Sequence, residues 1–230
     1  MKRFLLGLSL LFSFVSIHAQ EIKRTDPSFE DFLPLLKSTG YEVFNFDISS
    51  LKDSTYNISF ETKEYVNGVL VHDSSKDKYQ FFITNRDMIS DLSEEQQKEI
   101  LANNSAYDAE NDIFKLAKKI TVGFIPAADS LKKYSVTIEN MGTFGNSLKL
   151  KPIESPNFNN RYAYDARPFK VDKIEIGGFT PLVLIGSYWY DSNNGFIRFC
   201  GESEFSKDLS SKSLKLVPHF YVLGIMVVKR

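Results

Sequence analysis

Short runs in which apolar and polar side chains alternate recur along most of the chain, as expected for strands with one buried face. The clearest run is 55–66, where Tyr56, Ile58 and Phe60 fall on one face. The run 218–228 is apolar on both faces and predicts a central strand that is buried on both sides. The whole pattern predicts a mainly β protein with a few helices, arranged as a β-sandwich or as two packed β lobes.

Helical spacing interrupts this pattern in two regions. Residues 26–40 start with Asp26 as the expected N-cap, and their apolar face of Phe29, Phe32, Leu33 and Leu36 is expected to pack on a sheet. A capping box at 93–96 and apolar spacing over 113–120 predict two more helices. Residues 90–119 are therefore a predicted helical insertion. The β-rich segments 20–89 and 120–230 form either one sandwich or two lobes joined by it.

The stretch 180–205 predicts a hairpin whose strands are joined by the turn-rich loop 191–195. With Tyr190 opposite Phe196, Trp189 falls on the core face, and Tyr188, Tyr190 and Arg198 share a mixed face. Flat rings beside polar groups suit sugars, so these three are the candidate ligand-binding residues, with carbohydrate as the candidate ligand. Aromatic residues are also favoured on strands by packing alone, which is the competing interpretation.

Catalytic motifs are scarce. The chain has no Gly-x-Ser-x-Gly elbow, no P-loop and no Gly-x-Gly-x-x-Gly after a strand. Glu202 and Glu204 are two positions apart on the predicted strand, so they point the same way and could form the carboxylate pair of a glycosidase. Two solvent-facing charges on an edge strand would look the same. The pattern therefore favours a protein that is not an enzyme.

The first nineteen residues have the layout of a cleaved secretory signal. Lys2 and Arg3 precede an apolar stretch over 4–15, and Ala19 is the expected residue before the cut. The apolar stretch is short for a bilayer span, which needs about 20 residues. We therefore expect a mature chain of 20–230 with no membrane span, exported to the periplasm or to the cell surface and medium.

Charge and metal-ligand content exclude several classes of partner. Without the signal the chain has 26 basic and 29 acidic residues and no basic stripe, which argues against nucleic acid. Cys200 is the only cysteine, so it forms no internal disulfide and is expected to be buried and inert. The mature chain keeps only His72 and His219, so a zinc site is not expected. The sequence suggests neither a metal nor a cofactor.

Several features together resemble the uncharacterised secreted proteins of gut Bacteroidota that carry domain-of-unknown-function labels. They are the junction His18-Ala19-Gln20-Glu21, the body rich in Phe, Tyr, Asn and Lys, and hairpins such as Tyr65-Val66-Asn67-Gly68. The segments 53–55 and 129–131 are similar to the short O-glycosylation motif of that group. The resemblance is one of overall sequence style and not of a specific motif, so it transfers no catalytic residues. It implies export.

Three functional hypotheses follow. The first is a non-catalytic exported β protein that binds either a ligand, with a glycan as the candidate, or an envelope protein. The second is a secreted polysaccharide hydrolase that uses Glu202 and Glu204. The third is a structural subunit of an envelope assembly, in which the apolar strand 218–228 takes part in pairing.

Overall fold

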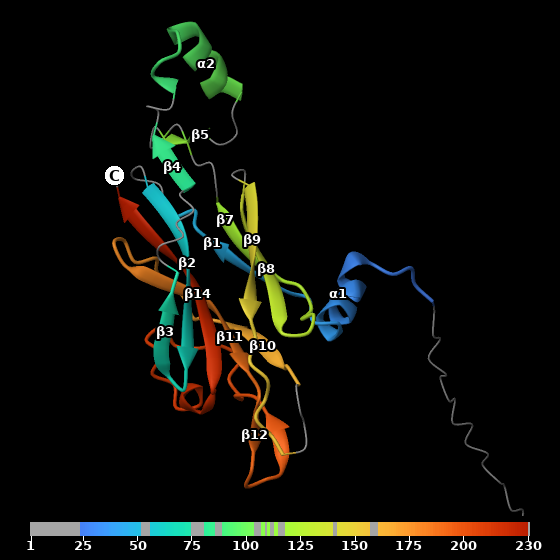
Figure 1. Ribbon diagram of the computed structural model, residues 1–230. Helices are drawn as coiled ribbons and strands as arrows, with labels where there is room; N and C mark the ends of the chain where they lie inside the picture. The colour runs from blue at the N-terminus through green and yellow to red at the C-terminus, as the bar shows by residue number, and fades with distance from the viewer. Residues whose placement is uncertain are drawn as a thin grey trace, which may run out of the picture.

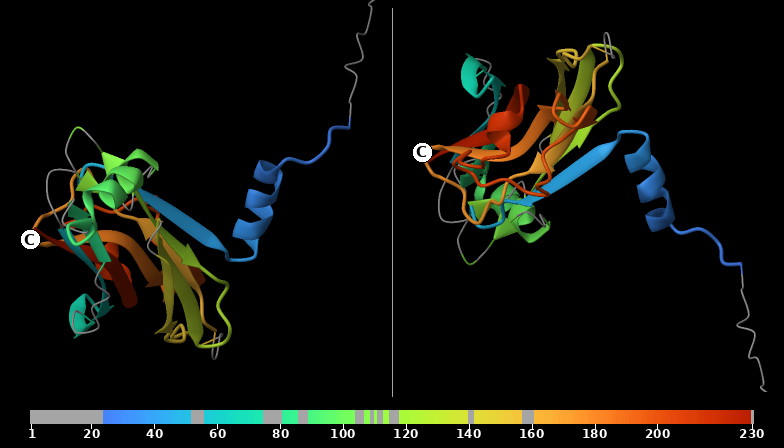
Figure 2. Two further views of the ribbon diagram at one scale, coloured as in Figure 1. Left: turned by 90° about the horizontal axis from the view of Figure 1, so that it is seen from above. Right: turned by 90° about the horizontal axis from the view of Figure 1, so that it is seen from below.

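The computed structural model describes residues 24–51, 56–74, 81–85, 89–103, 107–108, 110, 113–114, 118–139, 142–156 and 161–229. The predicted signal peptide and the 53–55 glycosylation motif lie outside these residues. The described chain is mainly β, with two antiparallel sheets facing each other across a shared core, as the sequence predicts (Figures 1 and 2).

The smaller sheet has four strands in the order β1-β7-β8-β9. The larger sheet has the order β10-β11-β14-β2-β4-β6-β5, with β3 also paired to β2, and β12 and β13 form a separate hairpin. The strand bounds are Glu42–Asp47 (β1), Tyr56–Val66 (β2), Val69–Asp73 (β3), Phe81–Asn85 (β4), Tyr107–Asp108 (β5), Ile113–Phe114 (β6), Lys119–Phe124 (β7), Leu131–Ile138 (β8), Gly142–Lys149 (β9), Tyr164–Pro168 (β10), Phe179–Ser187 (β11), Trp189–Asp191 (β12), Phe196–Arg198 (β13) and His219–Lys229 (β14).

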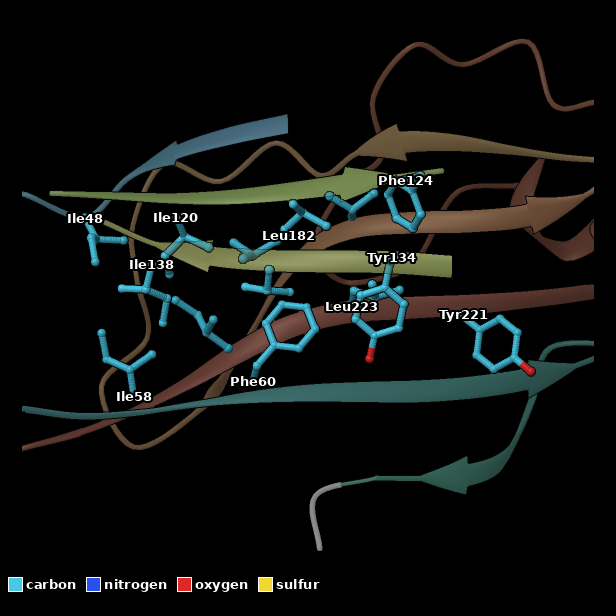
Figure 3. Close-up of a cluster of buried hydrophobic side chains, with 14 of the residues drawn as sticks. Ile48, Ile58, Phe60, Ile120, Phe124, Tyr134, Ile138, Leu182, Tyr221 and Leu223 are labelled. Atoms are coloured by element: carbon cyan, nitrogen blue, oxygen red, sulfur yellow. The ribbon is translucent and has the colours of Figure 1, made fainter. Parts of the chain in front are cut away.

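The main hydrophobic core fills the space between the two sheets (Figure 3). A second cluster lies on the outer face of the larger sheet, where the segment 199–218 covers it. This segment includes a short 3-10 helix at Leu214–Leu216. Strand β14 contributes Leu223 to the first cluster and Phe220 to the second, so it is buried on both faces, as its apolar run predicts.

Strands from either side of the predicted insertion are neighbours in each sheet. In the smaller sheet β1 pairs with β7, and in the larger sheet β2 pairs with β14 along its full length. The segments 20–89 and 120–230 therefore share both sheets and one core.

The predicted insertion 90–119 is only partly helical. Helix α2 (Glu94–Asn103) follows the capping box at Ser93, as predicted. The helix predicted over 113–120 is wrong, because Ile113–Phe114 is β6 and Lys119 begins β7. The alternating residues Ile120, Val122 and Phe124 all point into the core, and this strand pattern prevails over the helical spacing.

Helix α1 (Phe29–Ser38) stands away from the sheets (Figures 1 and 2). Its N-cap is Ser28 and not the predicted Asp26, because the Ser28 N–H and the Asp31 carboxylate close a capping box at 2.6 Å. The expected packing of its apolar face on a sheet is also wrong: the helix has no buried residue, and Phe29 is 74% exposed. Five large apolar side chains are left exposed on this helix: Phe29, Phe32, Leu33, Leu35 and Leu36.

Candidate functional site

A cleft of about 610 Å³ opens along one side of the sandwich. Strands β1 and β10, the outer strands of the two sheets, form its two long walls, and α1 and residues 200–203 border it. The cleft volume is within the range of known ligand sites, about 300–1,000 Å³. The cleft is therefore the open seam between the two sheets.

The walls of the cleft are largely apolar. Helix α1 contributes Leu33 and Leu36, β1 contributes Val43, and β10 contributes Ala166 and Pro168. Leu36 and Val43 are also exposed to solvent. A ligand with an apolar part would remove these side chains from water, at a gain of about 25 cal/mol per Å² of apolar surface buried.

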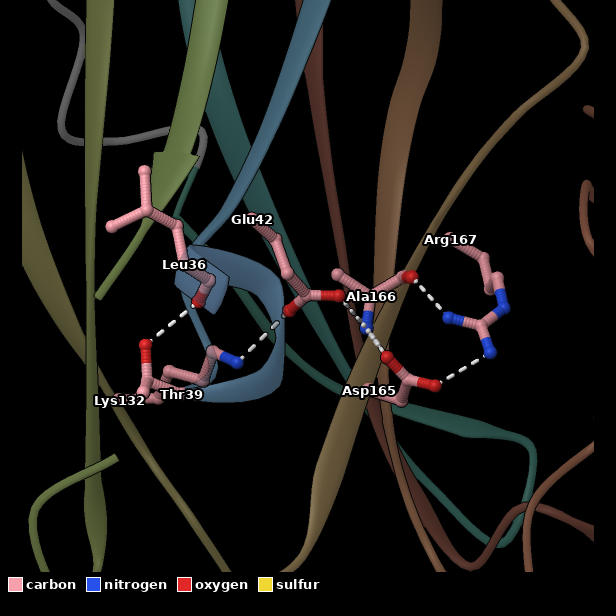
Figure 4. A network of polar contacts seen from close by, with 7 residues as sticks. All are labelled: Leu36, Thr39, Glu42, Lys132, Asp165, Ala166 and Arg167. Atoms are coloured by element: carbon pink, nitrogen blue, oxygen red, sulfur yellow. Dashed lines mark hydrogen bonds and ion pairs between the residues drawn. The ribbon is translucent and has the colours of Figure 1, made fainter. Parts of the chain in front are cut away.

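Two charged residues of the cleft lining, Glu42 and Arg167, belong to a connected network of polar contacts (Figure 4). The Lys132 ammonium lies 3.0 Å from the Glu42 carboxylate, and the two side chains are only 5% and 8% exposed. Burial raises the pKa of Glu42 above its ordinary value, and the Lys132 charge opposes that rise. Each ion is buried and needs its partner, since an unpaired charge in this position would be costly.

A second ion pair sits on β10 beside the first. The Asp165 carboxylate is 2.5 Å from the Arg167 guanidinium, which also donates to the Ala166 carbonyl at 2.7 Å. The Ala166 N–H points to the carboxylates of Asp165 (3.1 Å) and Glu42 (3.3 Å). Side chains thus occupy both backbone groups of Ala166, which protects this part of the β10 edge from pairing with another strand.

The rim at residues 200–203 holds the lone cysteine and one of the predicted glutamates. Cys200 is buried, as predicted, and burial raises the pKa of its thiol to about 11. It therefore stays a neutral thiol near pH 7, which is the less reactive form. The Glu202 carboxylate accepts hydrogen bonds from the Ser211 and Ser213 hydroxyls.

The predicted register of the 180–205 hairpin is off by one residue. Asp191, and not Tyr190, is opposite Phe196, so Arg198 pairs with Trp189 and Tyr190 with Ile197. The Asp191 side chain accepts hydrogen bonds from the Asn193 N–H and the Asn194 amide within the loop, so Asp191 ends the strand and the loop is one residue shorter.

This register places the three candidate ligand-binding residues in different surroundings. Arg198 lies 3.1 Å from Asp191 and stacks over the Trp189 ring at 5.6 Å. Tyr188 packs against Phe199, with ring centroids 5.1 Å apart, and burial raises the pKa of its hydroxyl. Tyr190 is a half-buried residue of β12. The mixed face predicted for Tyr188, Tyr190 and Arg198 is not formed.

The proposed carboxylate pair is also placed differently. Residues 199–204 are not a strand, so the alternation that aligned Glu202 with Glu204 does not apply. Glu202 lines the cleft and Glu204 is exposed on the following loop. Phe205, next in the chain, is buried and bridges to Phe169.

The residues of the charged network were missed at the sequence level, although two of them carry a signal. Lys132 is in phase with Tyr134, Val136 and Ile138, which face the core. Glu42 is likewise in phase with Phe44 and Phe46 on β1. A charged residue at an inward-facing position of a strand predicts a buried ion pair. The sequence does not reveal the partner, which lies 90 positions away.

A second polar cluster joins three strands at one end of the sandwich. The buried His219 ring contacts the Tyr164 hydroxyl through Nδ1 and the Glu64 carboxylate through Nε2, the latter at 3.0 Å. The Tyr164 oxygen already accepts the Lys151 N–H, so its O–H is available to donate to Nδ1. His219 is then neutral and donates its Nε2–H to Glu64.

We expect the free energy of unfolding to fall as the pH drops below about 6.5, the ordinary pKa of histidine. Burial lowers the pKa of His219, so the unfolded chain takes up this proton first and is favoured in acid. The stability associated with neutral His219 is present above that pH. As the pH falls, it is lost with a maximum slope of about 1.4 kcal/mol per pH unit. Urea titrations between pH 8 and 5.5 measure it. His219→Gln should show a shallower slope than the unaltered protein; equal slopes in the two proteins would contradict the assignment.

Neither a metal-binding cluster nor a membrane-spanning helix appears in the part of the chain that the structure describes. Within those ranges, no group of three or more His, Cys, Asp or Glu side chains is placed to hold a metal ion. Neither of the two described helices is long and apolar enough to cross a bilayer.

These features define a β-sandwich protein with a ligand-sized cleft between the outer strands of its two sheets. The chain belongs to the DUF5041 family, a domain of unknown function, and the sequence model of the family matches residues 11–229. No curated protein and no solved structure matches the chain. The geometry of the cleft therefore carries the functional argument.

Proposed function

We propose that this protein is exported to the periplasm or cell surface, where it binds a partner protein of the envelope in the cleft beside α1 and catalyses no reaction. The observation that carries the proposal is the apolar surface exposed around the cleft by α1 and Val43. Exposed contiguous apolar patches are rare on soluble monomers and mark interaction sites.

The charges of the cleft favour binding over catalysis. A general acid or base needs a carboxyl group that is free to exchange a proton with a substrate. Here Glu42 is paired with Lys132, Asp165 with Arg167, and Glu202 with two serine hydroxyls. These pairs fix the shape of the cleft and leave its apolar walls as the main source of affinity.

An extended polypeptide suits this cleft. Strand β1 is an outer strand of the smaller sheet, and its Val43 side chain is 63% exposed. Outer strands are ready templates for an added strand, and alternate side chains of the added strand then enter neighbouring pockets. The leucines of α1 would cover the other side of such a segment.

A photo-crosslinking amino acid placed at Val43 in the producing cells tests this proposal. We expect one discrete adduct with an envelope protein, reduced at least tenfold by Leu36→Asp in the same chain. Leu36 is 42% exposed, so this change should alter the free energy of unfolding by no more than about 0.5 kcal/mol. The purified partner should then bind the unlabelled protein and lose affinity for the Leu36→Asp variant.

Val69 provides the matched control, because it is also 63% exposed but lies on β3 of the other sheet. Crosslinks that are the same at Val43 and Val69, or that persist in Leu36→Asp, would rule out the cleft as the binding surface. Export is tested separately by mass spectrometry of the chain recovered from the periplasm and medium. We expect it to begin at Gln20; a chain that keeps Met1 and stays in the cytoplasm would overturn this part.

A further inference from the structure

One end of the sandwich interior is polar. The side chains at this end are polar although the alternation along their strands places them on the inward face. On β2, Ile58 and Phe60 face the core, and Thr62 and Glu64 continue the same face. Tyr221 sits on the inward face of β14, beyond Leu223 and Ile225. Figure 3 shows the tyrosine hydroxyls toward one end of the core and the isoleucines at the other. Placing polar groups inside a sandwich costs free energy, so this end is a candidate site.

A pocket of about 200 Å³ opens at this polar end, on the opposite side of the smaller sheet from β1. It lies between β2 and β3 of one sheet and β8 and β9 of the other. The volume is below the range typical of drug-sized ligands, about 300–1,000 Å³, and suits a molecule of a single ring. It shares no lining residue with the cleft beside α1.

Aromatic rings form one wall of the pocket. The Phe60 ring packs against Tyr134 at 6.1 Å and against Phe144 at 5.6 Å, measured between ring centroids. Phe60 and Tyr134 are buried and Phe144 is half-buried, so their positions are fixed by packing and not by a ligand. Rigid rings of this kind offer a preformed flat surface for the C–H face of a ligand ring.

Hydrogen-bonding groups of both kinds form the rest of the lining. The Glu64 carboxylate is anchored at one oxygen by the buried His219 ring and is 22% exposed. Thr62, Ser74 and Asn146 also line the pocket and carry hydroxyl or amide groups. Each hydroxyl can both donate and accept, and a carboxylate accepts several hydrogen bonds, which are stronger than neutral ones.

We propose that this pocket binds one neutral sugar ring. A sugar presents adjacent hydroxyls that donate to a carboxylate and accept from amides and hydroxyls, and its C–H face stacks on aromatic rings. Glu64 and Lys149 contribute one charge of each sign to the lining, which favours a neutral ligand over an anionic one. The site is independent of the partner cleft proposed above.

Ligand-observed NMR on the full mature chain tests the inference with glucose, galactose, mannose and N-acetylglucosamine as probes. We expect at least one of them to bind with a Kd of about 1 mM, a typical affinity for few contacts. Glu64→Gln should weaken that binding at least tenfold, because an amide replaces the accepting carboxylate. Asn146→Ala, at an exposed position that tolerates change, should weaken sugar binding severalfold. It keeps the test valid if the Glu64→Gln variant does not fold.

Tyr190→Ala is the matched control, since Tyr190 lies on β12, outside both the pocket and the cleft. Sugar binding should be unchanged in this variant and in Leu36→Asp, which disables the cleft. Absence of binding for all four sugars at about 50 mM, or binding that both Glu64→Gln and Asn146→Ala leave intact, would overturn the proposal. Binding lost in Tyr190→Ala but kept in Glu64→Gln would place the sugar on the β12–β13 hairpin and would also overturn it.

Discussion

Replacing Lys132 with Met is expected to lower the free energy of unfolding by about 3–5 kcal/mol at neutral pH. The substitution keeps an unbranched side chain that is one heavy atom shorter, and it removes the charge that lies 3.0 Å from Glu42. Glu42 is then left buried without its ammonium partner, and an uncompensated buried charge is among the most destabilising changes known. Urea denaturation followed by fluorescence measures the effect.

The deficit of Lys132→Met should depend on pH. Burial already raises the pKa of Glu42, and loss of the Lys132 charge raises it further. The loss of stability is therefore complete above the pKa of Glu42 in the folded variant. It shrinks as the pH falls toward the ordinary pKa of glutamate, about 4.3, where Glu42 is protonated in both the folded and the unfolded state. A deficit that stays constant from pH 8 to pH 5 would contradict this explanation.

Two further variants separate the charge from the packing. Lys133→Met makes the same change at the next residue of β8, which is exposed, and should alter stability by no more than about 0.5 kcal/mol. Lys132→Met combined with Glu42→Leu removes both ions and should restore most or all of the stability, since buried pairs are often replaceable by apolar residues. If the double variant is as unstable as the single one, the loss is due to packing.

Gly224→Ala should destabilise the fold by about 3 kcal/mol, the upper part of the range for overpacked cores. A Cβ at Gly224 would lie 2.4 Å from the Thr180 carbonyl oxygen and 2.6 Å from the Phe179 ring. Gly224 pairs with Pro181 on one side and Glu61 on the other, so β14 cannot move away without breaking a ladder of hydrogen bonds. The midpoint of urea unfolding should fall without a change in slope.

Gly201→Ala is the matched control for that experiment. An added Cβ at Gly201 meets no atom within 4 Å, so the change should be neutral or stabilise the protein by up to about 1 kcal/mol through the unfolded chain. Equal stabilities of the Gly224→Ala and Gly201→Ala proteins would show that β11 can yield at Thr180 and would remove the basis of the prediction.

The sequence predicted those parts of the fold whose signals are local. The Asn67-Gly68 dipeptide forms the tight β2–β3 turn with positive φ at both residues (49° and 77°), as two-residue hairpins require. The capping box at 93–96 begins α2, and the apolar run of β14 is buried on both faces. In each case neighbouring residues alone decide the local conformation.

Features that depend on distant partners could not be predicted in this way. The stripe on α1 has the periodicity of a packed helix, but periodicity does not say whether this chain or another one covers it. The hairpin register differs from the prediction because the Asp191 side chain binds groups of its own loop. The sequence suits both of the possible turns and does not choose between them. The charged network joins residues from β1, β8 and β10, and only the fold brings them together.

The position of β14 also bears on how the chain reaches its fold. The last described strand lies between β11 and β2, and its partner β2 ends 153 positions before β14 begins. Until the ribosome has made residues 219–229, the larger sheet lacks the strand between β11 and β2, and the core lacks Leu223, Ile225 and Val227. Contacts this distant in sequence are closed slowly because the loop entropy is lost before the contacts form. Folding of the sandwich is therefore disfavoured until residues 219–229 have been made.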